Sequence, residues 1–562
     1  MLKSILDIIP KSYRRRGLWV AATVFLRAIL NFVGVAMFVP ILMLTLKPEG
    51  GSRVLDRFSE LFAVDDHSEM VLAVCGIVLV VIVVKSLIVM LLHSYEQNFI
   101  FSFYKQVSQK LFLSYYERGL GYIKQHNSSH IARNINVAGL MFATGVLRPI
   151  AAILGEALLL VMVFIALAIY APIAALLTLV VFLPVMSIFW LAVRRRLHDI
   201  GVRENDVQRH KSRVVSETFR GYADIEIGGA KELMFSVFND DVDKVSDLRK
   251  RHATLSQLPQ ILVEIGVVVG MILVVLLSLD NGEDMALMFG IFAVVAIRLI
   301  PSVRNILSQW SLIKYNRYTI DILLDANVGE ERVVAEESCE GMRLQNSIEF
   351  DGVSFKFEDA DRPTIDTLSF TIARGEHIGI CGASGVGKTT LFNLLLGLYR
   401  PTSGVIRIDG EELTARHIRK WQNSIGYVSQ SLFIADSTIA ENIALGVAKD
   451  KIDYDLVNEA VRLANLHSFI ESLPNGLDTR IGEAGSRLSG GQRQRIGIAR
   501  ALYKGCDILL FDEATSSLDS VAEESINESL LALKRSNENL TIVLIAHRQS
   551  TLDNCNRIIT LE

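Results

Sequence analysis

The stretch GASGVGKTT, Gly382–Thr390, has residue types and spacing suited to binding a chain of phosphates. It fits the pattern GxxxxGK[ST] and lies between the apolar run HIGIC and the helix-forming run LFNLLLGLY, the context that this motif requires. In such a loop, backbone N–H groups converge on phosphate at a helix N-terminus. Lys388 would reach the β- and γ-phosphates, and the Thr389 hydroxyl would ligate Mg²⁺. The predicted phosphate-binding residues are Gly382, Ala383, Ser384, Gly385, Val386, Gly387, Lys388, Thr389 and Thr390.

A pair of carboxylates follows a second apolar run, in ILLFDEA. A buried strand that ends in Asp512 and Glu513 suits Mg²⁺ coordination by the first residue and activation of water by the second. An acidic helix cap at a strand end is the ordinary structural explanation for such a pair. Because a phosphate loop precedes it in the same chain, we predict Asp512 as a metal ligand and Glu513 as a general base.

The elements that must position these residues begin near Asn346. Short β-branched runs there alternate with helical segments, as in IEFDGVSFKF and TIVLIAH, which is typical of an α/β domain. We expect residues 346–562 to form an α/β P-loop nucleotide-binding domain, after a linker at 326–345. The chain stops at IITLE, where we expect a little more of this domain to follow.

The composition indicates a membrane protein. The chain has 562 residues, of which 51% are hydrophobic and 21% charged, and its mean hydropathy of +0.36 is too high for an ordinary soluble protein. The net charge of −4 gives no reason to expect a nucleic-acid partner. The five cysteines are scattered without metal-ligand spacing and are interpreted as reduced thiols.

Residues 1–325 contain six apolar segments, each near the ~20 residues that cross ~30 Å of hydrocarbon. They lie at about 17–46, 70–92, 148–170, 172–193, 258–279 and 285–307. Basic residues at 11–16 and 194–196 place the N-terminus in the cytoplasm. The predicted fold class is therefore an α-helical six-span membrane domain followed by the α/β domain.

The connections between the spans differ on the two sides of the membrane. The cytoplasmic connections, about 93–147 and 194–257, are long, charged, rich in helix formers and free of proline, so we expect helical extensions beyond the bilayer. In the outer loop, RVLDRFSELF has apolar residues at helical spacing. It is predicted either as an amphipathic helix on the outer membrane surface or as an ordinary helix packed on the spans.

LSGGQRQR, Leu488–Arg495, identifies a family. The chain resembles the ATP-binding-cassette proteins, whose signature motif is LSGGQ, and it resembles them over essentially its whole length. Gln430 in YVSQ matches the family's Q-loop, Asp519 in SSLD its D-loop, and His547 in IAHR its switch histidine. Phe357 lies where the family has an aromatic residue that stacks on adenine. The resemblance implies an ATPase with Mg²⁺ as cofactor, with Glu513, His547 and Gln430 as catalytic residues and Gln430 also at the metal.

The same resemblance implies a dimer. In this family the signature motif of one cassette closes on the nucleotide held by the phosphate loop of another. The residues implied to complete the partner's site are Ser489, Gly490, Gly491 and Gln492. One cassette and six spans make half a transporter. Since Glu513 and the signature are both intact, a homodimer is favoured, and a hetero-partner stays open.

Basic side chains within the predicted spans point to what is moved. They are Arg27, Lys85, Arg298 and Arg304. Cations at this depth are costly and usually face a water-filled cavity. From Arg298, polar residues recur at i, i+4, i+7 and i+11, at Ser302, Asn305 and Gln309, as a stripe on one helix face. Two interpretations stay open, a cavity that receives an anion and internal pairing with Glu156 and Glu264.

The membrane half resembles the bacterial flippases for lipid-linked oligosaccharides. The stretch AIRLIPSVRNILSQWSLIKYN, the outer segment RVLDRFSELF and the chain length carry this resemblance, and LPQILVEIG, with Gln260 and no cation, departs from it. It implies flipping of an anionic, amphipathic lipid-linked substrate across the cytoplasmic (inner) membrane of a bacterium. The alternative is a multidrug exporter or an exporter of other lipids or hydrophobic compounds.

Overall fold

The computed structural model describes residues 2–37, 67–170, 172–278, 285–327, 342–358, 360–512, 520–546 and 548–561. The chain divides into two compact units, Met1–Val333 and Val334–Glu562. The predicted outer-loop helix at 53–62 and most of the predicted linker at 326–345 lie outside the described residues. Within α10 and α13, some side chains lie outside them as well.

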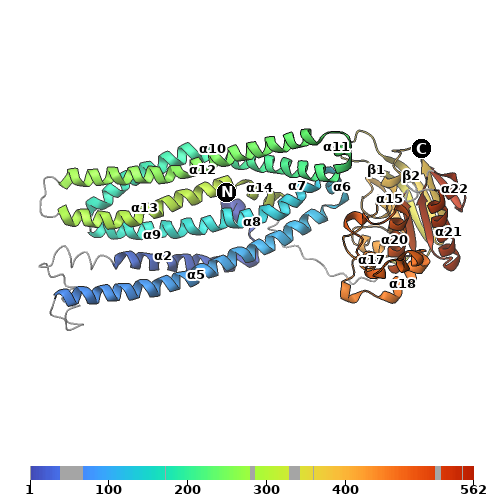
Figure 1. Cartoon of the computed structure of the whole chain (residues 1–562), viewed down its shortest axis with the longest axis horizontal. Helices are drawn as coiled ribbons and strands as arrows, with labels where there is room; N and C mark the ends of the chain where they lie inside the picture. Colours follow the sequence, from blue (N-terminus) through green and yellow to red (C-terminus); the bar gives the residue numbers. More distant parts are fainter. Residues whose placement is uncertain are drawn as a thin grey trace. The chain divides into compact units, whose positions relative to one another are not determined.

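The first unit is built from helices throughout the described part (Figure 1). They are α1 Leu2–Ile8, α2 Lys11–Ala36, α5 His67–Glu117, α6 Gly119–Gln125, α7 Ser128–Arg133, α8 Gly139–Phe142, α9 Arg148–Tyr170, α10 Pro172–Arg220, α11 Tyr222–Ile227, α12 Lys231–Ser278, α13 Met285–Tyr315 and α14 Tyr318–Asp325. Short π-helical turns flank α8. As predicted, the connections 93–147 and 194–257 are helical, because α5, α10 and α12 each continue without a break past the apolar segment.

Four stretches of the described residues are long and apolar enough to cross a membrane. They are Lys11–Ala36, Leu72–Glu117, Ser128–Ile169 and Lys231–Leu273. The two other predicted spans, 172–193 and 285–307, lie in α10 and α13, where some side chains are outside the described residues. The apolar side chains that α9, α10, α12 and α13 do bury form one core, which includes Leu159, Phe189, Val263 and Val303.

The second unit holds two sheets (Figure 1). An antiparallel sheet has the order β2-β1-β4-β5 and a parallel sheet the order β6-β7-β8-β3-β9. The strands are β1 Ser347–Phe355, β2 Ile365–Ala373, β3 His377–Gly382, β4 Ser403–Ile408, β5 Glu411–Glu412, β6 Ile425–Val428, β7 Ile508–Asp512, β8 Thr541–Ile545 and β9 Arg557–Leu561. The helices are α15 Lys388–Leu395, α16 Ile418–Asn423, α17 Ile439–Ile443, α18 Tyr454–Leu463, α19 His467–Glu471, α20 Gly490–Tyr503, α21 Ser520–Ser536 and α22 Gln549–Leu552.

The parallel sheet explains why its strands are nearly continuous apolar runs. Every residue of β7 and of β8 is buried, as expected where helices cover both faces of a parallel sheet. Since all the strands of this sheet run in one direction, the carboxyl ends of β3, β6 and β7 meet at one edge. The predicted phosphate loop follows β3, and the predicted carboxylates end β7, so the sheet brings both to that edge.

Candidate nucleotide site and membrane cavity

The phosphate loop connects β3 to α15 with a backbone that requires glycine. Gly387 has φ +107°, in the left-handed region, and a Cβ there would lie 2.9 Å from the carbonyl oxygen of Thr364. The Lys388 side chain is only 5% exposed. Its ammonium donates hydrogen bonds of 3.0 Å each to the carbonyl oxygens of Gly382 and Ala383. The loop therefore holds the Lys388 ammonium close to the N-terminus of α15. Both the ammonium and the helix N-terminus favour the binding of an anion at this place.

A second cluster forms where β6 and β7 end beside α15. The Thr389 hydroxyl donates to one Asp512 carboxylate oxygen at 3.4 Å, and the Tyr427 phenol donates to the other at 3.2 Å. Asp512 is 3% exposed. Burial, and next the neighbouring Asp512 carboxylate, raise the pKa of Tyr427, so the phenol stays protonated and able to donate.

This cluster supplies the kind of ligands that magnesium prefers. The hydroxyl and carboxylate oxygens of Thr389 and Asp512 fit Mg²⁺, which takes one or two protein oxygens together with water and phosphate. Sequence reasoning did not single out Tyr427, although it is the first residue of the YVSQ segment that holds Gln430. Only the pairing of β6 with β7 shows that this ring reaches Asp512.

Phe357 stands on a small aromatic cluster beyond the end of β1. Its ring contacts Phe355 at 4.9 Å and Tyr399 at 5.6 Å between centroids, in both cases edge-on. Phe355 and Tyr399 are themselves stacked at 5.0 Å. The exposed fraction of Phe357 is 36%, so neighbouring rings fix its orientation while part of it stays open to a flat ligand.

The signature motif begins helix α20 with a capping box. The Ser489 hydroxyl accepts a 3.2 Å hydrogen bond from the Gln492 backbone N–H, and the Ser489 N–H donates to the Gln492 side-chain oxygen at 2.8 Å. Gly490 and Gly491 form the first helical positions. Ser489 is exposed, so this helix start is accessible in the protomer.

The remaining predicted residues of the nucleotide site are described only in part. Gln430 is exposed and lies two residues past β6. Glu513, Asp519 and His547 lie outside the described residues.

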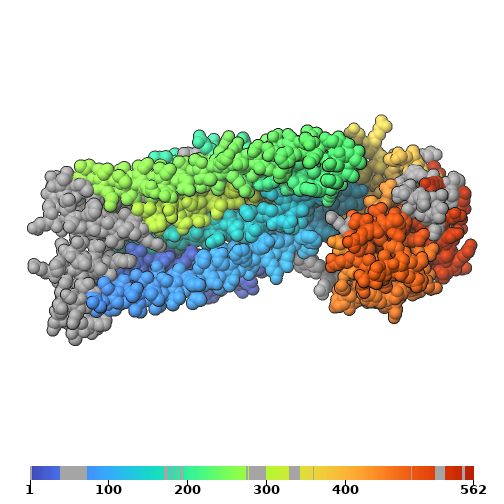
Figure 2. Space-filling view, viewed as in Figure 1, coloured from blue at the N-terminus to red at the C-terminus, as the bar shows by residue number. Residues whose placement is uncertain are grey.

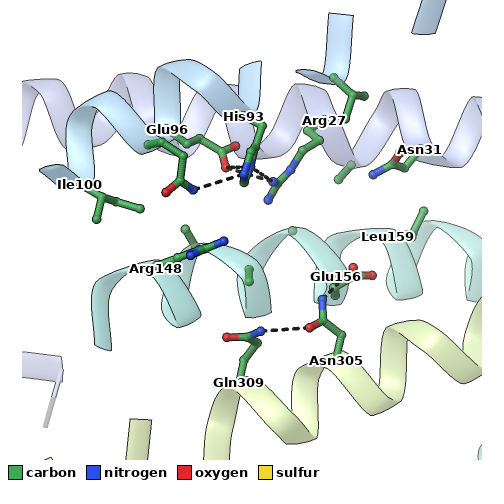
Figure 3. A pocket seen from close by; sticks show the side chains of 16 residues that line it. Arg27, Asn31, His93, Glu96, Ile100, Arg148, Glu156, Leu159, Asn305 and Gln309 are labelled. Carbon is green, nitrogen blue, oxygen red and sulfur yellow. Dashed lines mark hydrogen bonds and ion pairs between the residues drawn. The ribbon is translucent and has the colours of Figure 1, made fainter. Parts of the chain in front are cut away.

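A polar cavity of about 310 Å³ lies among α2, α5, α9 and α13 (Figure 3). Its polar lining comes from all four helices: Arg27, Asn31, His93, Glu96, Gln97, Arg148, Glu156, Asn305 and Gln309. The described part of the lining thus combines two arginines and two carboxylates with several amides.

Inside this membrane cavity, Arg27 already has a carboxylate partner. Its guanidinium lies 3.0 Å from a carboxylate oxygen of Glu96, which is 3% exposed, and 3.5 Å from a ring nitrogen of His93. The partner of Arg27 is therefore Glu96, which the sequence had not indicated. Arg148 projects into the same cavity from α9, and no described residue hydrogen-bonds or ion-pairs with it.

Among the described residues, the carboxylates that the pairing hypothesis invoked accept hydrogen bonds from amide side chains. Asn305 donates to one oxygen of Glu156 at 3.1 Å, and Gln309 donates to Asn305 at 3.1 Å (Figure 3). Gln260 donates to Glu264 at 3.0 Å. Asn305 and Gln309 of the predicted stripe line the cavity, whereas Ser302 is 1% exposed and buried in the helical unit.

Of the other predicted cations, Lys85 and Arg304 are not among the described residues that line this cavity. Lys85 packs against α2, where a Cβ on Gly34 would lie 2.9 Å from the lysine ammonium. Arg304 is exposed. Arg298 lies in α13, and its side chain is outside the described residues. The cavity therefore unites Arg27 with residues that the sequence did not single out, chiefly Arg148 and Glu96.

A phosphate loop on a parallel sheet, joined in one chain to helices long enough to cross a bilayer, defines a nucleotide-binding membrane protein. The family model for the ABC transporter matches residues 365–516. Two relatives are each named ATP-dependent lipid A-core flippase. The one from Burkholderia pseudomallei (strain 1710b) is 34% identical to this chain over 392 residues. The one from Ralstonia nicotianae (strain ATCC BAA-1114 / GMI1000) is 31% identical over 398 residues. Each match covers 69% of this chain and 65% of the relative.

A solved bacterial Atm1-family ABC exporter with ATP bound has the same fold, with a TM-score of 0.78 at 21% identity, over 98% of this chain and 94% of that one. Residues 365–516 therefore match the ABC transporter family, and the chain has the fold of an ABC exporter. The predicted fold class is confirmed, the match of residues 365–516 supports the predicted family, and the ABC transporter domain implies ATP binding.

Proposed function

We propose that this chain uses ATP hydrolysis to move an amphipathic lipid with an anionic, polar head group across the cytoplasmic membrane of a bacterium. The observation that carries the proposal is the polar cavity among membrane helices, in which two arginines lie beside carboxylates and amides. The relatives named lipid A-core flippases support the same substrate class. A lipid-linked oligosaccharide is a second member of this class.

In the proposed ATP site, each group acts on a different part of the nucleotide. Lys388 would leave its loop carbonyls to bind the β- and γ-phosphates, while Phe357 stacks on adenine. Thr389 and Asp512, with Gln430, would hold Mg²⁺, which when bound neutralises charge on the phosphates. Tyr427 orients the Asp512 carboxylate by its hydrogen bond.

Hydrolysis itself is assigned to residues beside the phosphates. Glu513 would accept a proton from the attacking water, with His547 and Asp519 completing the site. Ser489 to Gln492 would contact the γ-phosphate bound by a second copy of the chain, so the proposed working unit is a homodimer with two composite sites. The N-terminus and the ATP-binding domain are proposed to lie in the cytoplasm, in accordance with the basic residues at 11–16 and 194–196.

The cavity lining favours a polar head group over a purely hydrophobic cargo. Arg148 offers a cation without a described partner, to which a phosphate could bind through charge-assisted hydrogen bonds. One buried oxygen of Glu96 and one of Glu156 lack hydrogen-bond partners among the described residues. Hydroxyl groups of a sugar head could donate to those oxygens. Arg298 remains part of the proposed site, since its helix α13 also supplies Asn305 and Gln309.

The test is stimulation of ATP hydrolysis in proteoliposomes. Phosphorylated glycolipids of the lipid A type and polyprenyl-pyrophosphate glycans are compared with neutral lipids and with hydrophobic drugs. We expect stimulation by the anionic glycolipids, reduced at least tenfold by Arg148→Gln and unaffected by Arg304→Gln, a control cation on α13 outside the cavity lining. Equal stimulation by hydrophobic drugs that survives Arg148→Gln would instead assign the chain to the multidrug exporters.

A further inference from the structure

A second hollow, which we call the basic groove, lies between α10 and α12, outside the cavity already described. It encloses about 560 Å³ and is lined by Arg196 and Arg203 from α10 and by Lys250 and Arg251 from α12. Among the described residues, the one acidic residue in its lining is Asp199. Even though Lys250 also pairs with Asp247 at 3.4 Å, the groove keeps a net positive charge. All four cations are exposed, so they can reach a ligand from outside.

The position of the groove along the helices matches the membrane interface. The predicted spans end at 193 in α10 and begin at 258 in α12. At 1.5 Å per residue, Arg196 lies ~5 Å and Thr254 ~6 Å beyond the apolar segments. Lipid head groups occupy roughly the first 5–8 Å outside the hydrocarbon. Arg203 and Lys250 lie deeper in the cytoplasm, at ~12–15 Å, and their long side chains can reach back toward the interface.

The groove is apolar beneath its charged rim. Ile200 is 8% exposed at its floor, and Leu248 and Leu255 of α12 are half-buried beside it. Leu258 and Ile265 follow Arg251 at i+7 and i+14, so they lie on the same face of α12, nearer to the membrane. Ile265 is 56% exposed. The space-filling view shows α12, in green, uncovered along the face drawn (Figure 2). A cationic end followed by an apolar strip suits a lipid.

The groove is built before any ligand arrives, because an ion pair fixes the spacing of its two helices. Glu204, next to Arg203, is 5% exposed and accepts a 2.9 Å hydrogen bond from Arg249, next to Lys250. The Tyr315 hydroxyl of α13 donates to the other oxygen of Glu204. A ligand therefore need not order the backbone of either helix, which lowers the entropy cost of binding.

We propose that the basic groove binds the head group of an anionic phospholipid of the inner leaflet, such as phosphatidylglycerol, as a resident lipid distinct from the transported one. The phosphodiester would accept hydrogen bonds from Arg196 and Arg251, and an acyl chain would lie along the apolar strip of α12. The proposal rests on the proposed membrane orientation, which puts this end of both helices in the cytoplasm, and is independent of what the cavity transports.

The test is a lipid titration of the full chain, followed by native mass spectrometry in the absence of nucleotide. Phosphatidylglycerol is compared with phosphatidylcholine of the same acyl chains. The double variant Arg196→Gln/Arg251→Gln is compared with Arg195→Gln/Lys244→Gln, which removes two exposed cations of the same helices from outside the lining. Since each interfacial cation contributes roughly fivefold, we expect the groove variant to bind phosphatidylglycerol about 25-fold more weakly and the control to bind as the parent does.

Three results would overturn the proposal: no preference of the parent for phosphatidylglycerol, unchanged binding by the groove variant, or an equal loss in the control. A further arm separates this lipid from the transported one. Arg148→Gln should leave phosphatidylglycerol binding intact even where it abolishes substrate-stimulated ATP hydrolysis. Stoichiometric displacement of phosphatidylglycerol by a lipid A-type glycolipid would assign the groove to the transport path instead.

Discussion

The capping box at the start of α20 allows two roles of Ser489 to be separated by experiment. Ser489→Ala removes the oxygen that accepts from the Gln492 N–H, and loss of an N-cap costs about 1 kcal/mol of stability. Ser489→Asp keeps an N-cap acceptor, and its negative charge is favoured at a helix N-terminus. The first variant should therefore be destabilised, whereas the second should be as stable as the parent or slightly more so.

The effect of Ser489→Asp on ATP turnover should differ from its effect on stability. If Ser489 contacts the γ-phosphate bound by the partner, the carboxylate introduced by Ser489→Asp would stand about 4 Å from phosphate charge. At an effective dielectric constant of 20, two like charges at that distance repel by about 4 kcal/mol. That repulsion corresponds to a loss of roughly 10³-fold in turnover. The stable variant is thus the one expected to be inactive.

A second capping box in the same domain provides the control. The Thr438 hydroxyl caps α17 by accepting from the Glu441 N–H at 3.2 Å. Thr438 is 6% exposed whereas Ser489 is exposed, so Thr438→Ala should cost at least as much stability as Ser489→Ala. For a domain of this size about 1 kcal/mol lowers the Tm by roughly 2–4 °C. Thr438→Ala should show that shift and still hydrolyse ATP within about twofold of the parent.

The assays are thermal unfolding of the purified full chain and ATP hydrolysis at saturating ATP. Near-parental turnover by Ser489→Asp would refute the contact between Ser489 and the partner's nucleotide. If Thr438→Ala loses as much turnover as Ser489→Ala, the loss in both reflects destabilisation of the domain, and Ser489 has no special role.

Three further predictions use the same assays. Glu513→Gln should bind ATP with near-parental affinity and lose at least 10²-fold in turnover, because the amide cannot accept the proton; near-normal turnover would remove Glu513 from this role. Tyr427→Phe should raise the Mg²⁺ concentration for half-maximal turnover by about tenfold, because Asp512 loses its orienting hydrogen bond, and an unchanged magnesium titration would contradict this. Arg27→Gln should lower the Tm strongly by leaving Glu96 buried without its partner, and adding Glu96→Gln should restore part of the loss; additive losses would show that the ion pair is not coupled.

The phosphate loop of the candidate nucleotide site could be predicted from the sequence because its pattern is local. Gly387, Lys388 and Thr389 are contiguous, and their positions follow from a strand, a tight loop and a helix that each leave a clear pattern. The contact between Thr389 and Asp512 is long-range, yet it follows from parallel strands whose carboxyl ends meet at one edge. The role of Tyr427 could not be predicted, because an aromatic residue in a strand is ordinarily a packing residue. Nothing in the neighbouring sequence indicates that its hydroxyl donates a hydrogen bond to Asp512.

The membrane cavity could be predicted only in part, because its contacts join separate helices. Arg27 and Glu96 meet through the packing of α2 on α5, and no spacing rule relates residues on different helices. Glu96 was placed in a cytoplasmic connection because the apolar run ends near 92, whereas α5 continues unbroken to Glu117. Arg148 was treated as the first residue of a span. The helical turns that precede it make it part of a longer helix, and it faces the cavity.

The arrangement of charges in the cavity bears on how it could select a substrate. The described lining, with two arginines and two carboxylates, gives the cavity little net attraction for an anion, so selection by the total charge of these residues would be weak. The charged groups nevertheless differ in their partners. Arg27 forms an ion pair with Glu96, whereas Arg148 has no partner among the described residues. Glu156 accepts a hydrogen bond from Asn305. A head group that carries phosphate at one point and hydroxyls at others matches that pattern, and a simple anion matches only Arg148. The cavity would therefore discriminate by the spacing of charge and hydrogen bonds on the head group, and the carboxylates that stabilise the empty state would also contribute to specificity.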